Sequence, residues 1–409
     1  MNKYNTFLLA FILGLLTLGT TNQIFAMEES KKILILTSAG GGGHLTASTS
    51  LEAQLKDSYQ IETVNVFQDL LGPLDPIRSL TSNKYSLEEI YNYLVPAKNY
   101  NILTLFRDVG NWFMQHHHKE DIQQLLRNYF KKNNPDLIIS VIPLINNIIL
   151  DTAQELNIPF ILMPTDLDIT MYVTNIKNPT YKQFKICLPF DDEEIMTPLK
   201  NAGITKDHVA IVGPPLKPNF FEKKNIALLK SNLNIPENKP AIMILMGSQG
   251  LDDTEKYTAE LIKLEQPAHL IICFGKNEAS KEAIEKMTIP SHITISLVGF
   301  TTRIADYMAV SDLLITKSGT LSVCEAIYMN LPMLLDATST ILPWEWFNHM
   351  FIKKHHFGES ITDYSMVVPL VSSLIYKDKI ILDSYKNNLK TFKKPHNQQI
   401  MKELVRTML

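Results

Sequence analysis

Short apolar runs alternate with stretches of helical periodicity along the first half of the chain. The runs are rich in Leu and β-branched residues and cover 31–39, 61–67, 135–142 and 159–166. Strands that are apolar at every position are buried on both faces, which is typical of a parallel sheet covered by helices. The intervals between the runs leave room for crossover helices. The first half is therefore predicted to be doubly wound α/β.

The same pattern restarts after the proline-rich segment 212–221, which is predicted to be an interdomain hinge. We predict two Rossmann-like, doubly wound parallel-sheet domains that face each other across a cleft, spanning 27–215 and 216–385. A basic C-terminal helical segment follows at 386–409. The apolar runs of the second domain cover 241–250, 268–275, 293–300, 312–319 and 331–337.

Residues 1–26 carry a different pattern. Lys3 precedes the apolar stretch 7–19, which is short for a membrane-spanning helix of about 20 residues but suits a signal-peptide core. The segment is predicted to be a signal peptide or an N-terminal membrane anchor. Translation from Met27 is the alternative, and it would leave a peripheral cytoplasmic protein.

Composition and charge limit the kinds of binding partner that are expected. The net charge of -3 provides no electrostatic footprint for duplex DNA, so nucleic acid is not an expected partner. Cys187, Cys273 and Cys324 lie in apolar runs without CxxC spacing, and we interpret them as buried hydrophobic residues. No metal site is expected. This includes His116–His118, because three consecutive side chains cannot converge from one helix.

A glycine run separates the first apolar run from the helix that follows it. Backbone N–H groups of Gly41, Gly42 and Gly43 can turn toward a ligand, and the helix N-terminus favours negative charge. The loop matches neither the dinucleotide fingerprint nor the Walker loop, in which a lysine would replace His44. His44 is left at the edge of the cleft, where a general base can act. The alternative is that the loop is only a tight turn.

Two segments of the second domain are suited to phosphate. Gly247, Ser248 and Gly250 follow its first predicted strand and offer free backbone donors. A strand, loop and helix at 312–326 bring together one cation, hydroxyls and amides, from Lys317, Ser318, Gly319, Thr320 and Ser322. Glu325 lies on that helix, where a carboxylate can accept two ribose hydroxyls. An exposed helix cap with an incidental lysine is the alternative.

Two aromatic segments remain. In 342–348, Glu345 and Asn348 can hydrogen-bond sugar hydroxyls beside two tryptophans, although core tryptophans under a loop would give the same pattern. In 104–118, a histidine tract follows apolar residues that suit a membrane-interface segment, and a core helix is the alternative. The apolar residues in question are Phe106, Trp112, Phe113 and Met114.

Taken in order, these motifs resemble glycosyltransferase family 28, which has the GT-B fold. The branch it resembles most is the group of monogalactosyldiacylglycerol synthases and processive diacylglycerol glucosyltransferases. The resemblance covers residues 31 to about 360 and rests on an ordered set of short motifs. These are ILTSAGGGGH, PDLIIS, PFILMPTDL, VGPPLKPNF, ILMGSQG, ICFGKN, VGF, SDLLITKSG, EAI and LPWEWFN.

The resemblance implies an inverting, metal-independent hexosyltransferase with no cofactor beyond its UDP-sugar co-substrate. His44 matches the family's candidate base, and Gly41, Gly42, Gly43 and Asp166 lie on the lipid-acceptor side. The resemblance also implies which residues contact each part of the donor. Gly247, Ser248, Gly250, Lys317, Gly319, Thr320 and Ser322 would contact phosphate, Glu325 the ribose, and Glu345 and Asn348 the sugar. Gly275 and Asn277 match a donor-side turn of the family, and Phe300 follows the glycine near which the uracil would be held. A membrane-associated role in glycolipid biosynthesis follows.

The chain also departs from the family pattern. Tyr172 lies near a position where plant-type members carry tryptophan, Ile142 replaces a histidine before Pro143, and Leu321 replaces a glycine in the phosphate loop. The first two changes lie on the acceptor side. Two other functions therefore stay open: an isomerase similar to UDP-N-acetylglucosamine 2-epimerases, and a nucleotide-sugar-binding relative without turnover.

Overall fold

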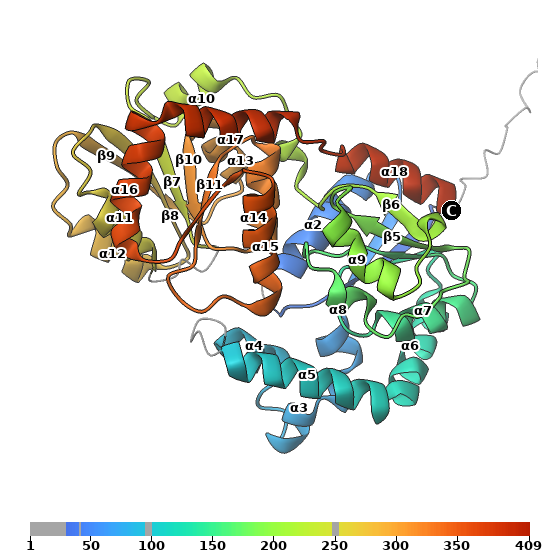
Figure 1. Ribbon diagram of the computed structural model, residues 1–409. Coiled ribbons are helices and arrows are strands. Elements are labelled where there is room, and N and C mark those ends of the chain that lie inside the picture. Colours follow the sequence, from blue (N-terminus) through green and yellow to red (C-terminus); the bar gives the residue numbers. More distant parts are fainter. Residues whose placement is uncertain (1–29, 41, 95–99, 248–252) are drawn as a thin grey trace, which may run out of the picture. The chain divides into compact units, whose positions relative to one another are not determined.

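The computed structural model describes residues 30–40, 42–94, 100–247 and 253–409, without the side chains of residues 100, 101 and 106. The chain divides into two units, Met1–Lys31 and Lys32–Leu409, and the second contains every helix and strand of the described part. The elements are labelled in Figure 1.

The first half of the larger unit is a six-stranded parallel sheet with the order β2-β1-β3-β4-β5-β6. Its strands are β1 (Lys32–Thr37), β2 (Gln60–Asn65), β3 (Leu137–Ser140), β4 (Phe160–Leu162), β5 (Phe184–Leu188) and β6 (Val209–Ile211). The strand order reverses direction between β1 and β3. In open α/β sheets, ligands bind outside the carboxyl ends of the strands at such a switch point.

Helices connect these strands, and several of them lie between β2 and β3. The α-helices are α2 (Gly43–Leu55), α3 (Pro76–Leu80), α4 (Leu87–Leu94), α5 (Tyr100–His116), α6 (Lys119–Asn133), α7 (Asn146–Glu155), α8 (Thr170–Val173) and α9 (Glu193–Asn201). Shorter 3₁₀ or π turns are η1 (Val66–Leu70), η2 (Gly72–Leu74), η3 (Lys206–His208) and η4 (Pro218–Phe220).

The second half is another six-stranded parallel sheet, with the order β12-β11-β10-β7-β8-β9. Its strands are β7 (Ala241–Leu245), β8 (Ala268–Gly275), β9 (Ile293–Gly299), β10 (Leu313–Thr316), β11 (Met333–Asp336) and β12 (Gly358–Ile361). Renumbered from its own first strand, this is the 3-2-1-4-5-6 order of the Rossmann fold. Its switch point lies between β7 and β10.

The helices of the second half follow the same alternation. They are α10 (Ile226–Asn232), α11 (Asp253–Leu261), α12 (Glu278–Glu285), α13 (Ile304–Val310), α14 (Thr320–Tyr328), α15 (Pro343–Lys354), α16 (Val367–Ser372), α17 (Lys379–Thr391) and α18 (Asn397–Met408). Two short turns, η5 (Tyr364–Met366) and η6 (Ser373–Lys377), precede and follow α16.

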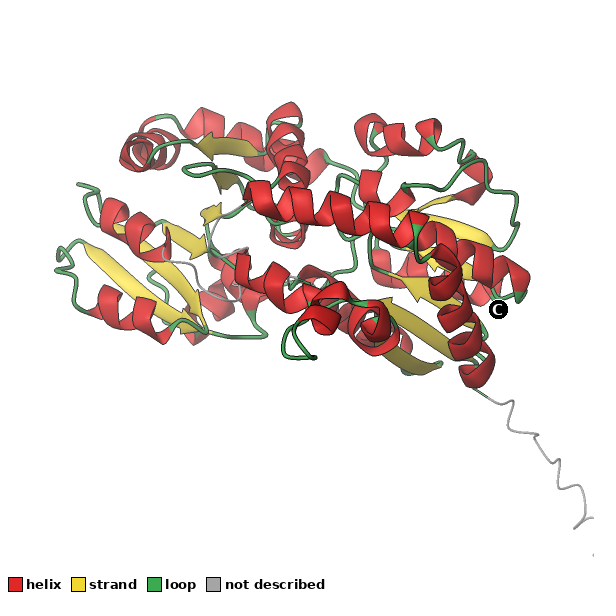
Figure 2. Cartoon of the chain, turned by 90° about the horizontal axis from the view of Figure 1, so that it is seen from below, coloured by secondary structure: helices red, strands yellow, loops and turns green. Residues whose placement is uncertain are grey.

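Both sheets are covered on both faces, as the continuous apolar runs predicted. Successive residues of β1 belong to different hydrophobic clusters, Leu34 to one and Ile35 to another, and both are fully buried. Met243 and Ile244 of β7 divide between two clusters in the same way. Figure 2 shows the strands of each sheet with helices on either side. The prediction of two doubly wound parallel sheets is confirmed.

The C-terminal stretch differs from its prediction in detail. It is helical, as predicted, and consists of α17 and α18, but the predicted boundary between residues 385 and 386 falls inside α17. α18 packs on the first sheet, because Met401 and Val405 join the cluster around Ile33. The Asn397 side chain accepts a hydrogen bond from Gln54 and donates one to the carbonyl of Gly213.

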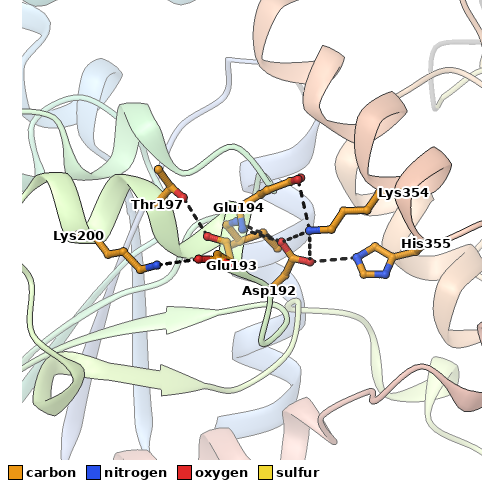
Figure 3. Close-up of polar contacts among 8 residues, drawn as sticks. Asp192, Glu193, Glu194, Thr197, Lys200, Lys354 and His355 are labelled. Atoms are coloured by element: carbon orange, nitrogen blue, oxygen red, sulfur yellow. Dashed lines mark hydrogen bonds and ion pairs between the residues drawn. The ribbon is translucent and has the colours of Figure 1, made fainter.

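Charged contacts join α9 of the first half to the end of α15 in the second (Figure 3). Asp192 caps α9 and is nearly buried, and its carboxylate lies 3.0 Å from both Lys354 Nζ and His355 Nε2. The neighbouring Glu193–Lys200 pair stays within α9 and is exposed. Lys354 also lies 3.4 Å from Glu194, so Asp192 and Glu194 both link the two halves through this lysine.

Candidate functional site

The carboxyl ends of three adjacent strands meet at the switch point of the first sheet. β1 leads into the glycine loop and His44, β3 into Val141, and β4 into Thr165 and Asp166. Because neighbouring parallel strands end at the same edge, residues more than a hundred positions apart come within hydrogen-bond distance. The site predicted around His44 is therefore built by the sheet order itself.

His44 is the second residue of α2 and is half-buried. Its Nδ1 atom lies 2.9 Å from the carbonyl oxygen of Val141. A carbonyl can only accept, so Nδ1 carries the proton of the neutral ring and Nε2 keeps its lone pair. Burial lowers the pKa of His44, while Asp166, the Val141 carbonyl and Glu88 act in the opposite direction. A neutral imidazole with a free Nε2 is the form that a general base requires.

Glu88 on α4 holds the start of the glycine loop, a role that sequence reasoning missed. Its carboxylate accepts hydrogen bonds from the Ser38 hydroxyl at 2.6 Å, the Ala39 N–H at 2.8 Å and the Asn65 amide at 2.9 Å. Three donors on one buried carboxylate fix the end of β1, and hence the entry to α2. Nothing in the local sequence of α4 signals this contact.

A cavity of about 210 Å³ lies next to His44 and is lined mainly by apolar side chains. Its lining combines Glu88 and Asp166 with Trp344, which comes from the second half of the chain. The Arg107 guanidinium lies over the Trp344 ring at 5.2 Å from the ring centroid. The apolar lining includes Phe67, Leu71, Leu74, Leu103, Phe113 and Met114.

At the second switch point, a lysine lies between two glycines. Gly247 follows β7 with φ +86°, a backbone conformation that residues other than glycine rarely adopt. A Cβ on Gly247 would lie 3.1 Å from Lys317 Cε, and one on Gly319 would lie 3.3 Å from the same atom. The two glycines thus leave room for the Lys317 stem, beside the backbone N–H groups that open α14.

Glu345 and Asn348 approach this loop from α15. The Ser318 hydroxyl donates to Glu345 at 3.2 Å. Burial raises the pKa of Glu345, and Lys317 acts against that shift. Asn348 is fully buried and donates to the Ser318 carbonyl at 2.6 Å and to the Thr320 hydroxyl at 3.0 Å. In this structure Asn348 supports the loop from behind, and its contact with a sugar stays a prediction.

Thr320 links the two halves of the site. Its hydroxyl donates to Asp166 at 3.2 Å, so the first turn of α14 contacts the loop that follows β4. Ser322 and Glu325 are half-buried on the same helix. Burial raises the pKa of Glu325 to about 8, and Lys217 acts in the opposite direction. Their predicted contacts with phosphate and ribose remain untested.

The residues expected in the donor-side turn and near the uracil lie at the ends of β8 and β9, which pair with each other. Gly275 has φ +62° and faces Gly299 across the two strands. Asn277 caps α12 by accepting the Ser280 N–H at 3.0 Å. Phe300 is 62% exposed, with Lys276 Nζ 5.1 Å from the centroid of its ring. An open aromatic face and a glycine turn share this edge.

Three residues of the predicted site, Gly41, Ser248 and Gly250, lie outside the described residues. The other two loop glycines are described: Gly42 is the N-cap of α2, and Gly43 is its first residue. Within the described ranges, no three His, Cys, Asp or Glu side chains gather in the manner of metal ligands.

The segment 104–118 falls mostly on α5, and its aromatic residues separate by face. Phe113 and Met114 line the cavity, whereas Trp112 is 53% exposed; the side chain of Phe106 lies outside the described residues. The outer face also carries Ile102, Leu105 and Val109, all exposed. None of the helices in the described part combines the length and apolarity needed to cross a bilayer.

In 342–348, the alternative of core tryptophans is wrong for Trp346. That residue is 53% exposed and stacks on His349 with ring centroids 5.6 Å apart. Trp344 is half-buried at the cavity. Phe347, by contrast, is half-buried and packs against the core, as that alternative expected.

Comparison with known proteins places the second switch point in a known domain. Residues 241–336 match the model of the Glycosyltransferase family 28 C-terminal domain. This range begins at β7 and ends with β11, so it includes Gly247, Gly275, Lys317 and Glu325. The resemblance found in the sequence is confirmed by this match, which covers residues 241–336.

Relatives among characterised proteins extend over most of the chain. A processive diacylglycerol beta-glucosyltransferase of Staphylococcus carnosus is 23% identical over 309 residues, which are 75% of this chain and 76% of the relative. The Bacillus subtilis protein of the same name is 22% identical, covering 92% of this chain and 95% of its own. Monogalactosyldiacylglycerol synthase 3 of Arabidopsis thaliana is 26% identical over 76% of this chain and 67% of its own.

Solved structures agree on the fold. MurG of Acinetobacter baumannii aligns with a TM-score of 0.60 at 15% identity, covering 92% of this chain and 99% of its own. A UDP-glucosyltransferase of Polygonum tinctorium aligns with a TM-score of 0.58 at 12% identity, covering 93% and 98%. The fold is GT-B. With the family domain and the relatives, it identifies the chain as an enzyme of the hexosyltransferase class.

Proposed function

We propose that the enzyme transfers a hexose from a UDP-hexose to the hydroxyl of a diacylglycerol-type lipid, with inversion at the anomeric carbon and without a metal ion. The observation that carries the proposal is the apolar cavity beside His44, which Trp344 of the second half also lines. An apolar chain in this cavity would bring its polar end to the only histidine of the glycine loop. The names of the relatives point to the same class of acceptor.

The chemistry follows from the two switch points. His44 Nε2 takes the proton of the acceptor hydroxyl while that oxygen attacks the anomeric carbon. The new C–O bond forms as the bond between the anomeric carbon and the UDP phosphate oxygen breaks. Lys317 and the N–H groups that open α14 stabilise the negative charge that UDP gains. A single displacement of this kind inverts the configuration.

The donor assignment rests on the matched family domain. Lys317, Gly247 and Gly319 would hold the diphosphate, Glu325 the ribose, and Glu345 the hexose. Glu345 is half-buried next to Ser318, in reach of a sugar bound above Lys317. No cofactor is proposed beyond the nucleotide sugar.

We also propose that the exposed face of α5 touches the membrane surface from which the lipid enters. Ile102, Leu105, Val109 and Trp112 recur at helical spacing and are each about half exposed or more. Phe113 and Met114 of the same helix line the cavity, so α5 would separate the bilayer surface from the acceptor pocket.

Ligand-dependent melting tests the donor assignment first. The protein is titrated with UDP, UDP-glucose, UDP-galactose, UDP-N-acetylglucosamine and NAD. We expect UDP to raise the melting temperature, Glu325→Ala to abolish that rise, and one UDP-hexose to give a further shift. NAD should have no effect. A folded sample that responds to no uridine nucleotide would contradict the proposal.

Product analysis then separates the three functions. With UDP-hexose and diacylglycerol vesicles, the proposal predicts a glycosylated lipid. An epimerised nucleotide sugar released without lipid would identify an isomerase. UDP binding with no donor consumed across a broad acceptor panel would identify a binding protein.

A further inference from the structure

A line of hydroxyl groups connects His44 to Asp166. Thr165 Oγ1 lies 3.1 Å from His44 Nδ1 and 2.7 Å from the Tyr172 hydroxyl. The Tyr172 hydroxyl donates to Asp166 at 2.9 Å. Thr165 and Tyr172 are both buried, so water does not compete for these contacts. The Asp166 carboxylate also accepts a hydrogen bond from the Thr320 hydroxyl, and this second bond holds the carboxylate in place.

The hydrogen bonds of this line run in one direction. His44 Nδ1 carries a proton because its other partner, the Val141 carbonyl, can only accept. Thr165 Oγ1, at 3.1 Å, is therefore a second acceptor of the same N–H, which His44 shares between the Val141 carbonyl and Thr165. The single hydroxyl proton of Tyr172 goes to Asp166, so the Thr165 hydroxyl donates to the Tyr172 oxygen. Each donor from His44 to Asp166 thus points the same way, and consecutive bonds of this kind strengthen one another.

The charges around His44 explain what a row of hydrogen bonds to Asp166 can contribute. When the imidazole takes a proton at Nε2, it becomes a cation in a half-buried site, and burial disfavours that form. The carboxylates that act on it electrostatically are Asp166, after β4, and Glu88, on α4. The Glu88 carboxylate already accepts hydrogen bonds from Ser38 and Ala39, at the start of the glycine loop. Burial raises the pKa of Tyr172 well above its ordinary value, so its hydroxyl stays a donor.

We propose that Tyr172 is a positioning residue for His44, acting through Thr165 to fix the imidazole and to couple its developing charge to Asp166. The inference rests on the proposed role of His44 as the base. No proton needs to travel along the line: the Nδ1–H bond strengthens as Nε2 is protonated, and the hydroxyls shift their dipoles toward Asp166. Tyr172 touches neither substrate in this account.

Tyr172 also lies near one of the positions at which this sequence departs from the pattern of plant-type members of the family. Of α8, which has only Thr170–Val173, Tyr172 is the residue that reaches Thr165 and Asp166. The backbone carbonyl of Tyr172 is held separately, by the Asn146 amide at 3.1 Å. Removing the hydroxyl therefore leaves the anchor of α8 in place.

Tyr172→Phe tests the inference with a matched control. Tyr181→Phe removes a phenol of the same half that donates to the Ile158 carbonyl at 2.9 Å, away from this line. For Tyr172→Phe we expect kcat to fall about tenfold with unchanged UDP affinity, and the acidic limb of the kcat profile to move about 0.5–1 pH unit lower. Tyr181→Phe should change thermal stability but not the position of that limb.

The pKa of His44 gives a readout that needs no turnover. It is followed by NMR of the histidine-labelled full-length protein without substrates, with the resonance assigned through His44→Gln. Tyr172→Phe and Asp166→Asn should each lower this pKa, because each weakens the stabilisation of the imidazolium by Asp166. In the Asp166→Asn background, Tyr172→Phe should add little. Equal shifts in both backgrounds would overturn the coupling.

Thr165 supplies the rescue experiment. Thr165→Val breaks the line and should reproduce the effect of Tyr172→Phe, whereas Thr165→Ser keeps the hydroxyl and should stay close to the wild type. If neither Tyr172→Phe nor Thr165→Val moves the His44 titration, the inference is wrong. If the titration moves but no lipid is glycosylated by any variant or by the wild type, the proposed function fails while the coupling stands.

Discussion

The two switch points of this protein have the same topology and different chemistry. Each lies where the strand order of a parallel sheet changes direction, and in each case the first strand is followed by a glycine-rich sequence. At the first, a buried network surrounds His44 next to an apolar cavity. At the second, Gly247 and Gly319 make room for Lys317 beside a helix start. The fold determines where ligands bind, and the side chains determine which ligands they are.

The contrast also separates two electrostatic tasks. In the proposed mechanism, His44 needs a nearby anion when it accepts a proton. Asp166 would provide that anion through Thr165 and Tyr172. Lys317 would instead meet an anion that arrives with the substrate. The contact between Thr320 and Asp166 joins the two regions, so the acceptor side and the donor side share one carboxylate.

Loss of the base should give the largest difference between the two regions. His44→Ala removes the proton acceptor at the first switch point and leaves the second untouched. We expect transfer to fall by about 10²–10⁴-fold, the range for a positioned base, with UDP affinity nearly unchanged. Initial rates and calorimetric titration with UDP measure the two effects. Wild-type rates in His44→Ala would remove His44 from the mechanism.

Lys317→Met should have the opposite signature. Removing the cation weakens contact with the diphosphate, so UDP affinity is expected to fall about tenfold or more along with kcat. Lys353→Met, at an exposed lysine of α15, is the control for a general change in charge. Comparable UDP affinity in the two variants would mean that Lys317 does not contact the nucleotide.

The α5 surface tests whether the first region faces lipid. Leu105→Gln and Trp112→Gln replace side chains that are 64% and 53% exposed, so little folding stability should be lost. Each should weaken binding to anionic phospholipid vesicles by about tenfold, the loss expected for one large apolar side chain. Sedimentation with vesicles measures it.

Ile380→Gln is the matched control for that experiment, because Ile380 is 81% exposed on α17 of the other half. It should leave vesicle binding unchanged. If all three variants bind vesicles like the wild type, α5 is not the membrane-facing surface.

Glu325 should give the smallest effect, visible as a pH dependence of stability. Folding raises its pKa from 4.5 to about 8, so the folded state keeps a proton that the unfolded chain releases. Its contribution to stability is complete below pH 4.5 and is lost as the pH rises toward 8. Glu325→Gln should therefore gain stability over the wild type between pH 5 and pH 8, by up to about 3 kcal/mol. Calorimetry at both values measures it.

The exposed Glu285 on α12 is the control, since Glu285→Gln neutralises a carboxylate in contact with water. Its difference from the wild type should be the same at both pH values. A Glu325→Gln variant that behaves in this way would contradict the raised pKa of Glu325.

The comparison also explains what the sequence could and could not predict. Long apolar runs identified the central strands, including β1, β3, β7 and β10. The edge strands β6 and β12 were missed because β6 has only Val209–Ile211 and β12, with the sequence GESI, has no apolar run. β5 was missed as well, although its run FKICL is interrupted only by Lys185.

Site residues divided in the same manner. His44 follows a glycine run, and Lys317 directly follows β10 and precedes Gly319; both were predicted from local sequence. Glu88 was not predicted, because its partners lie at or just after the ends of β1 and β2 and only the tertiary fold brings them to α4.

The partners of Tyr172 lie only six or seven residues away, but local sequence does not reveal that α8 turns the phenol back toward Thr165 and Asp166. Asn348 was expected in contact with a sugar; in the structure its amide donates to the Ser318 carbonyl of the loop, an orientation that the sequence did not indicate, and the sugar contact stays a prediction. Local patterns do not give the orientation of a helix.

One assay tests the central claim most directly. The purified enzyme is treated with EDTA and incubated with diacylglycerol vesicles and a UDP-α-hexose, in parallel with His44→Ala, and the extracted lipid is examined for anomeric configuration. We predict a β-hexosyl lipid from the wild type and at least a hundredfold less from His44→Ala. An α-linked product, or no hexosyl lipid from a wild-type sample that binds UDP, would contradict it.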